Sequence, residues 1–113
     1  MIGIKSLDMI DQPKASITKI VYKPHGRLDS ETYDNHRKEL LSIVYTVPDV
    51  LILDMQDVRF IDSRGLGLLI TTLKIVKSNN GRLVLHSLTD QVDMLLKLTG
   101  TNKLFEIQSA GML

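Results

Sequence analysis

Residues 57–67, Asp-Val-Arg-Phe-Ile-Asp-Ser-Arg-Gly-Leu-Gly, are the stretch that decides the fold. Their apolar residues predict a buried strand that ends at Ile61, and the glycines that follow belong to the start of a helix. Asp62 and Ser63 lie at this junction. The neighbouring sequence offers the serine no base, no nucleophile relay and no metal ligands. We therefore expect Ser63 to be a residue that is modified, not one that catalyses.

Composition narrows the class of protein. The chain has 113 residues, 43% of them hydrophobic and 24% charged, with a net charge of +1. This predicts one folded domain over residues 1–113 and no general attraction to nucleic acid. The absence of cysteine excludes disulfides and thiolate chemistry. No apolar run approaches the roughly 18–20 residues of a membrane span, and the N-terminus lacks a signal-peptide layout, so we expect a cytoplasmic protein without membrane insertion.

Strands and helices alternate in the predicted pattern. Short apolar or β-branched runs predict strands over 17–22, 50–53, 82–85 and 104–107, with a short N-terminal strand within 1–10. Helical spacing predicts a first helix capped by Asp29 or Ser30 and ended by Pro48, a second that starts after Ser63 and reaches about Ser78, and a third from Thr89 to Gly100. Residues 108–113 read as a loose tail.

The predicted fold class is α/β. Strand–helix–strand units with short connections give parallel strands through right-handed crossovers. The first half of the chain lacks that strict alternation. We therefore expect a mixed sheet of four to five strands, with three to four helices packed mainly on one side.

The helix after Ser63 carries two stripes of residues. One stripe has the spacing of a core face and consists of Leu66, Leu69, Ile70, Leu73 and Val76. The other lies nearly opposite and consists of Arg64, Leu68, Thr71 and Ile75. Two apolar residues on an outward face indicate either a partner surface or a second layer of the same protein that covers them.

Two interpretations of Ser63 follow from its position. Ser63 or Asp62 can cap the helix, a role worth about 1 kcal/mol. Alternatively, a phosphate on Ser63 would add about −1.5 to −2 charges at a positive helix end without unfolding the domain. Arg64 is unusual because a cation in the first turn opposes the helix dipole. Its partner is Asp62, a phosphate on Ser63, or a carboxylate of another protein.

The residues around Ser63 resemble a motif of a known protein family. Phe60-Ile-Asp-Ser-Arg-Gly-Leu-Gly67 resembles the phosphorylation-loop motif of the STAS domain in bacterial anti-sigma factor antagonists. Further blocks that agree in order and spacing are His25-Gly-Arg-Leu-Asp29, Asn80-Gly-Arg-Leu-Val-Leu85 and Leu96-Lys-Leu-Thr-Gly-Thr-Asn-Lys-Leu-Phe105. Together these blocks cover nearly the whole chain from about Ile17 to Ile107.

The resemblance implies a protein-binding switch that is not itself an enzyme. In that family an anti-sigma serine kinase binds the unphosphorylated form, which frees the sigma factor. Phosphorylation of the serine after the aspartate, here Ser63, ends the complex, and a PP2C-type phosphatase resets it. The resemblance further implies that Asp62 holds the loop and engages the kinase, that Gly65 and Gly67 permit close backbone approach, and that Asp29 belongs to the neighbouring surface. The family often has a small residue where this chain has Arg64.

The partner-binding residues expected from the motif and the outer stripe are therefore Asp29, Asp62, Ser63, Arg64, Gly65, Gly67, Leu68, Thr71 and Ile75. We expect no cofactor and no metal, because the histidines lie on separate segments and the glycine spacing fits neither nucleotide fingerprint. The free protein is expected to be a monomer or weak dimer. Alternative roles are a STAS subunit of a stress-signalling scaffold, or of a secretion or lipid-transport regulatory complex.

Overall fold

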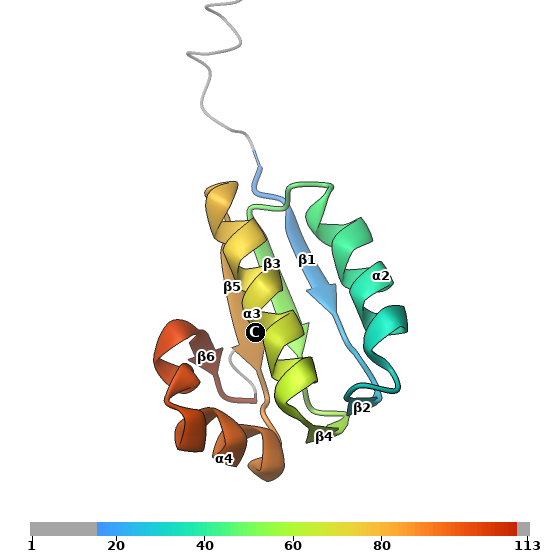
Figure 1. The fold of residues 1–113 in the computed structure, drawn as a ribbon. Helices are drawn as coiled ribbons and strands as arrows, with labels where there is room; N and C mark the ends of the chain where they lie inside the picture. Colours follow the sequence, from blue (N-terminus) through green and yellow to red (C-terminus); the bar gives the residue numbers. More distant parts are fainter. Residues whose placement is uncertain (1–15, 111–113) are drawn as a thin grey trace, which may run out of the picture.

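The computed structural model describes residues 16–110, so the strand expected within 1–10 lies outside the described residues (Figure 1). Most described strands form one sheet, hereafter the main sheet, in the order β1–β3–β5–β6. Its strands are β1 (Lys19–Tyr22), β3 (Val50–Asp54), β5 (Arg82–His86) and β6 (Glu106–Gln108). All pairings in this sheet are parallel. The expected α/β fold, with helices mainly on one side, is confirmed.

Helices α2 (Tyr33–Val44) and α3 (Ser63–Ser78) lie side by side against one face of the main sheet (Figure 1). Helix α4 (Asp90–Thr99) lies near the end of the molecule where β4 is found. It ends at Gly100, whose φ of 73° is a left-handed conformation that glycine adopts without strain. A short 3₁₀ helix (Thr101–Leu104) then leads the chain into β6.

The core lies between α2, α3 and the facing side of the main sheet. Every second residue of β3 and β5 points to the helices, as strand geometry requires. The residues of these strands that belong to the core cluster are Leu51, Leu53, Leu83 and Leu85, while Ile52 and Val84 are buried outside that cluster. From α3 the expected core stripe supplies Leu66, Leu69, Leu73 and Val76, all buried, while Ile70 is half-buried against the same cluster. Hydrophobic periodicity therefore predicted this face correctly.

The sequence did not predict a second, smaller sheet. Strands β2 (Gly26–Leu28) and β4 (Val58–Ile61) pair in parallel and form the small sheet, with Arg27 opposite Phe60 and Leu28 opposite Ile61. The segment around Gly26 read as a turn because it is short and follows a proline. The small sheet matters for function because β4 leads directly into Asp62.

Helix α2 begins later than its predicted caps. Its N-cap residue is Thr32, and no side chain caps the helix there. Asp29 instead accepts hydrogen bonds from the amides of Glu31 (3.0 Å) and Thr32 (3.2 Å), which closes the turn before the helix. The expectation that Asp29 or Ser30 is the cap was wrong by two or three residues.

Candidate functional site at the start of helix α3

The junction between β4 and α3 presents Ser63 at the surface. Asp62 is the N-cap: its Oδ1 accepts from the amide of Gly65 (2.9 Å), and its Oδ2 accepts from the amide of Ser30 (3.2 Å). Ser63 is exposed, and its hydroxyl makes no hydrogen bond to any residue in the described range 16–110. Of the two candidates for the cap, Asp62 fills the role. The hydroxyl of Ser63 is therefore accessible to an enzyme that would modify it.

Gly65 brings the first turn of α3 against β2. A Cβ atom at this position would lie 2.0 Å from the carbonyl oxygen of Leu28, so no larger residue fits without displacing the backbone. The amide of Asp62 donates to the same carbonyl at 3.3 Å. Gly65 is buried, so its close approach is to its own chain and not to a partner. Gly67 is exposed, and a Cβ there would meet no atom of the described chain within 4 Å.

Side chains from the turn before α2 and from α2 itself occupy the outer edge of β2. Thr32 donates from its hydroxyl to the carbonyl oxygen of Arg27 (2.8 Å). The Nε2 atom of His36 donates to the same oxygen at 3.0 Å. An unpaired strand edge leaves backbone polar groups without hydrogen-bond partners. The hydroxyl of Thr32 and the imidazole of His36 are such partners for the carbonyl of Arg27.

The outer edge of β4 is held in the same way by the start of α4. Thr89, the N-cap residue of α4 as predicted, donates from its hydroxyl to the carbonyl of Val58 (2.8 Å) and makes no cap bond. Gln91 accepts from the amide of Ile61 (2.9 Å) and donates to its carbonyl (3.3 Å). The side chain of Gln91 thus makes the hydrogen bonds that a neighbouring strand would make to Ile61, the residue just before Asp62. Sequence reasoning missed this residue, and no local signal marks it because its partner lies 30 residues away.

Asp29 lies beneath the surface. Only 3% of it is exposed, and its carboxylate accepts from Arg27 Nε at 2.5 Å. That hydrogen bond is the main reason why the pKa of Asp29 lies below its usual range. Desolvation raises the pKa, and the hydrogen bonds from the backbone amides of Thr32 and Glu31 lower it further. The carboxylate is therefore not displayed at the surface, and a role of Asp29 in partner contact stays a prediction. Asp29 shapes the turn that borders the site.

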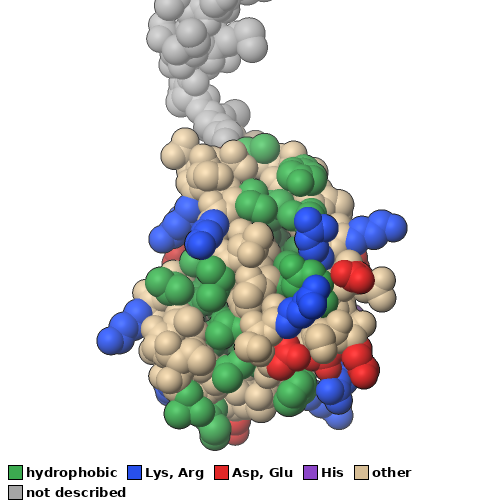
Figure 2. All heavy atoms as spheres, viewed as in Figure 1, with side chains coloured by type: hydrophobic (Ala, Val, Ile, Leu, Met, Phe, Trp, Pro, Cys, Tyr) green, Lys and Arg blue, Asp and Glu red, His purple; other side chains and the backbone are tan. Residues whose placement is uncertain are grey.

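The outer stripe of α3 is only partly exposed. Arg64 and Thr71 are exposed and Ile75 is half-buried, but Leu68 is 1% exposed and belongs to the core cluster. For Leu68 the second alternative holds, because it belongs to the same buried cluster as Leu40 and Val44 of α2, the helix that packs beside α3. The face of α2 and α3 carries hydrophobic side chains between Lys and Arg side chains, and acidic side chains gather where the two helices begin (Figure 2).

Arg64 does not extend freely into solvent. Its guanidinium carbon lies 4.2 Å from the ring centre of Tyr33, the first residue of α2. This is a cation–π contact, which offsets the unfavourable position of the cation in the first helical turn. Within residues 16–110 Arg64 forms no ion pair. Asp62, one of the partners considered from sequence, is bonded instead to backbone amides.

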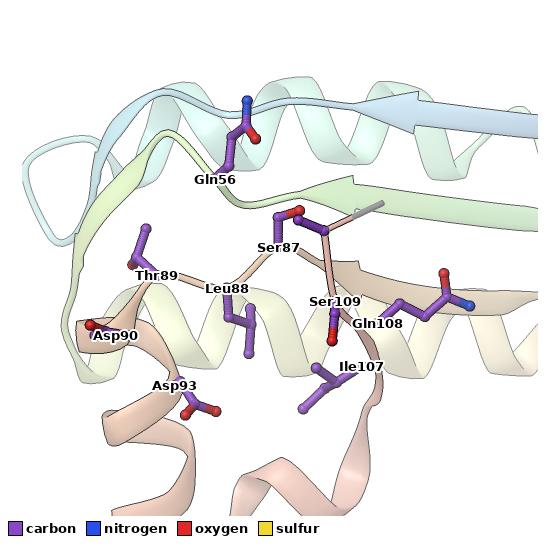
Figure 3. A pocket seen from close by; sticks show the side chains of 10 residues that line it. Gln56, Ser87, Leu88, Thr89, Asp90, Asp93, Ile107, Gln108 and Ser109 are labelled. Carbon is purple, nitrogen blue, oxygen red and sulfur yellow. The ribbon is translucent and has the colours of Figure 1, made fainter. Parts of the chain in front are cut away.

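The structure also contains a hollow away from Ser63. It measures about 450 Å³ and lies where β5 and β6 end and α4 begins. Leu88, Asp93 and Ile107 point toward one another across it (Figure 3). The hollow shares none of its lining residues with the expected partner-binding set, although Thr89 borders it and also bonds to β4.

No group of His, Asp and Glu side chains within residues 16–110 is arranged to hold a metal ion. In the same range no helix has the length and apolar character to cross a membrane.

Comparison with known families identifies the class of protein that this fold and site define. Residues 8–110 match the STAS domain model, so the chain belongs to the STAS domain family. The anti-sigma-B factor antagonist of Listeria monocytogenes is 31% identical over 86 residues, with 74% of each chain covered. The anti-sigma-B factor antagonist of Bacillus subtilis is 30% identical over 84 residues, covering 74% of this chain and 76% of the relative.

Solved structures share the fold. An anti-sigma factor antagonist from Mycobacterium paratuberculosis superimposes with a TM-score of 0.72 at 21% identity, over 86% of this chain and 80% of the other. The anti-sigma factor antagonist SpoIIAA in its unphosphorylated form gives 0.71 at 18% identity, over 88% and 86% of the two chains. The STAS domain of a SulP transporter from Vibrio cholerae gives 0.68 at 16% identity, over 92% and 83%. Because a transporter domain has the same fold, function must be argued from the site.

Proposed function

We propose that this chain is an anti-sigma factor antagonist that acts by partner switching. With Ser63 unmodified it binds an anti-sigma serine kinase, and the sigma factor is released. Phosphorylation of Ser63 ends this binding, and a PP2C-type phosphatase restores it. The protein performs no chemistry of its own in this cycle: it is the substrate of both enzymes.

The observation that carries the proposal is the separation of roles at the junction. Asp62 provides the helix cap, so the adjacent hydroxyl of Ser63 is not needed for the fold. Ser63 is exposed at the first position of α3, where a phosphate meets a positive helix end and unpaired amides. A modification there changes the charge of the surface and leaves the core untouched. The curated relatives named anti-sigma-B factor antagonists support the same role.

The proposed contact surface consists of the exposed members of the predicted set. These are Ser63, Arg64, Gly67 and Thr71, with Ile75 half-buried beside them and Asp62 at the rim. Asp29, Gly65 and Leu68 support this surface from below. The addition of about −1.5 to −2 charges among these residues would change electrostatic complementarity with a partner, which costs several kcal/mol where like charges meet.

The test is to capture partners from an extract of the host cell with the wild-type protein, Ser63→Ala and Ser63→Asp, before and after ATP is added. We expect wild type to retain a kinase until ATP is added, Ser63→Ala to retain it throughout, and Ser63→Asp to lose it. Mass spectrometry of the wild-type protein should map the phosphate to Ser63.

A matched control is Ser78→Asp, which places the same charge at the exposed opposite end of α3. This variant should bind like wild type. Equal capture by Ser63→Ala and Ser63→Asp, or a phosphate mapped to another residue, would contradict the proposal.

A further inference from the structure

Two arginine–aromatic contacts flank the Asp62–Ser63 step. On one side the guanidinium of Arg27 lies 4.9 Å from the ring centre of Phe60, across the small sheet. On the other side the guanidinium of Arg64 lies 4.2 Å from the ring centre of Tyr33, which joins α3 to α2. Both contacts place a guanidinium over an aromatic ring, so Arg27 serves as a reference for what is particular to Arg64.

The difference lies in the charge partner of each arginine. Arg27 donates to the carboxylate of Asp29, which is almost fully buried. Arg64 forms no ion pair within residues 16–110, and its side chain is exposed. An exposed cation–π contact is weak, and the helix dipole opposes a cation at this position. Arg64 is therefore held weakly, whereas Arg27 is held by a charge-assisted bond as well.

A phosphate on Ser63 would offer Arg64 a stronger partner than Tyr33 does. Hydrogen bonds between charged groups are stronger than those between neutral groups, and a guanidinium binds phosphate oxygens in a bidentate manner. Adjacent helical residues point in different directions, but the guanidinium stands at the end of a long flexible stem and the phosphate extends from Ser63.

We propose that Arg64 is the residue that receives the phosphate of Ser63, and that in doing so it leaves the ring of Tyr33. The inference rests on the proposed function only in taking Ser63 as the modified residue. Its consequence is that the modification alters two helices at once. The charge changes at the start of α3, and the half-buried ring of Tyr33 becomes uncovered at the start of α2. A partner docked across both helices would then lose its contacts on each.

The experiment uses the full chain with phosphoserine installed at position 63 during translation, so no kinase is needed. Nuclear magnetic resonance then compares the modified and unmodified proteins. In the unmodified protein the side-chain protons of Arg64 should be shifted upfield by the ring of Tyr33. With phosphoserine this shift should disappear, the Nε–H of Arg64 should become slow to exchange, and the ring signals of Tyr33 should move.

The matched variants are Arg64→Gln and Arg27→Gln, each prepared with phosphoserine at position 63. Arg64→Gln should abolish the response of the Tyr33 ring and raise the second pKa of the phosphate, measured by a ³¹P titration. Arg27→Gln should leave both readouts as in the wild-type protein. If Arg27→Gln disturbs the core methyl signals, Arg27→Lys takes its place, because it keeps the charge beside Asp29.

The proposal is overturned if the Arg64 signals are unchanged by phosphoserine, or if the phosphate pKa is the same in Arg64→Gln and wild type. These outcomes leave the proposed function intact, because phosphorylation of Ser63 still adds charge to the surface. Conversely, a host extract that never phosphorylates Ser63 would remove the proposed function, while the response of Arg64 to an installed phosphate would still be measured.

Discussion

The main sheet and the small sheet share one buried core, to which the small sheet contributes Leu28, Val58 and Ile61, but the small sheet depends in addition on polar side chains at its edges. In the main sheet, buried leucines from β3 and β5 pack against two helices, and many side chains share the stabilisation. In the small sheet, strands of three and four residues are too short to be stable alone. Single polar side chains hold its edges: Thr32 and His36 on β2, and Thr89 and Gln91 on β4.

The two sheets therefore differ in how strongly they respond to the substitution of a single residue. A core that many residues share tolerates a conservative change and responds in proportion to the volume removed. A polar edge held by one side chain loses its geometry when that side chain is changed. Ser63 follows directly on the small sheet, so its presentation depends on the second kind of interaction. The following substitutions test this division, because they separate an effect on the stability of the fold from an effect on the position of the loop that carries Ser63.

Replacement of Gly65 by alanine should have the largest effect. The added Cβ would overlap the carbonyl oxygen of Leu28, and only a backbone shift relieves the clash. We expect the free energy of unfolding to fall by about 3 kcal/mol or more, measured by urea denaturation. Gly67→Ala is the matched control on the same turn: its Cβ meets no described atom, and stability should rise by about 0.5–1 kcal/mol. Equal effects of the two changes would show that the contact with β2 is unimportant.

Leu68→Ala tests whether the residue belongs to the core. Because Leu68 is 1% exposed among core residues, we expect a loss of about 2–5 kcal/mol in the free energy of unfolding. Leu98, which is 77% exposed on α4, provides the control, and Leu98→Ala should change stability by less than about 0.5 kcal/mol. A stable Leu68→Ala protein with weakened partner binding would restore Leu68 to the contact surface.

Gln91→Leu tests the edge of β4. The change keeps the size of the side chain but leaves the amide and carbonyl of Ile61 without their partner. We expect a loss of about 1–3 kcal/mol, together with faster hydrogen exchange at the Ile61 amide than at amides of β3. Asp90→Asn, one residue before Gln91 and exposed, should affect neither measurement strongly. Unchanged exchange at Ile61 would mean that Gln91 does not hold the strand.

Asp29→Asn tests the turn beside the site through its pH dependence. Because the pKa of Asp29 is lowered in the folded protein, its carboxylate contributes stability above the unfolded pKa, about 3.9, and this contribution is lost as the pH falls further. Wild type should therefore lose more stability than Asp29→Asn between pH 5 and pH 3 (roughly the range that spans that unfolded value), measured by thermal unfolding. Asp93→Asn, in an exposed ion pair with Lys97, controls for the loss of one carboxylate. Identical pH profiles for wild type and Asp29→Asn would rule out this role.

Much of the fold was predictable because its signals are local. The run Val50–Leu53 predicted a buried strand, and the spacing of Leu66, Leu69 and Leu73 predicted the face that α3 turns to the sheet. Gly100 predicted the end of α4. The small sheet escaped prediction because its strands are too short to show periodicity, and their pairing joins segments about thirty residues apart.

The candidate site was predictable in position but not in detail. The motif around Asp62 and Ser63 located the junction, and the resemblance to STAS domains implied that Ser63 is phosphorylated, which stays a prediction. Helical spacing placed Leu68 with Arg64 on one stripe, yet it carried no information on whether α2 covers that stripe. Asp29 was expected at the contact surface from the family resemblance, and the resemblance did not show that Arg27 and two nearby amides enclose its carboxylate.

From the sequence alone followed the strands of the main sheet between residues 16 and 110, the face of α3 that enters the core, and the position of the exposed serine. These follow from caps, glycines and periodicity, which act between residues close in the chain. Only the tertiary structure decided that Asp62 caps the helix, that Gln91 completes the edge of β4, and that Arg64 lies on Tyr33. The last two are contacts between segments distant in sequence. The physical reason is that a side chain's partners are set by which elements pack beside it, and packing is a property of the whole fold.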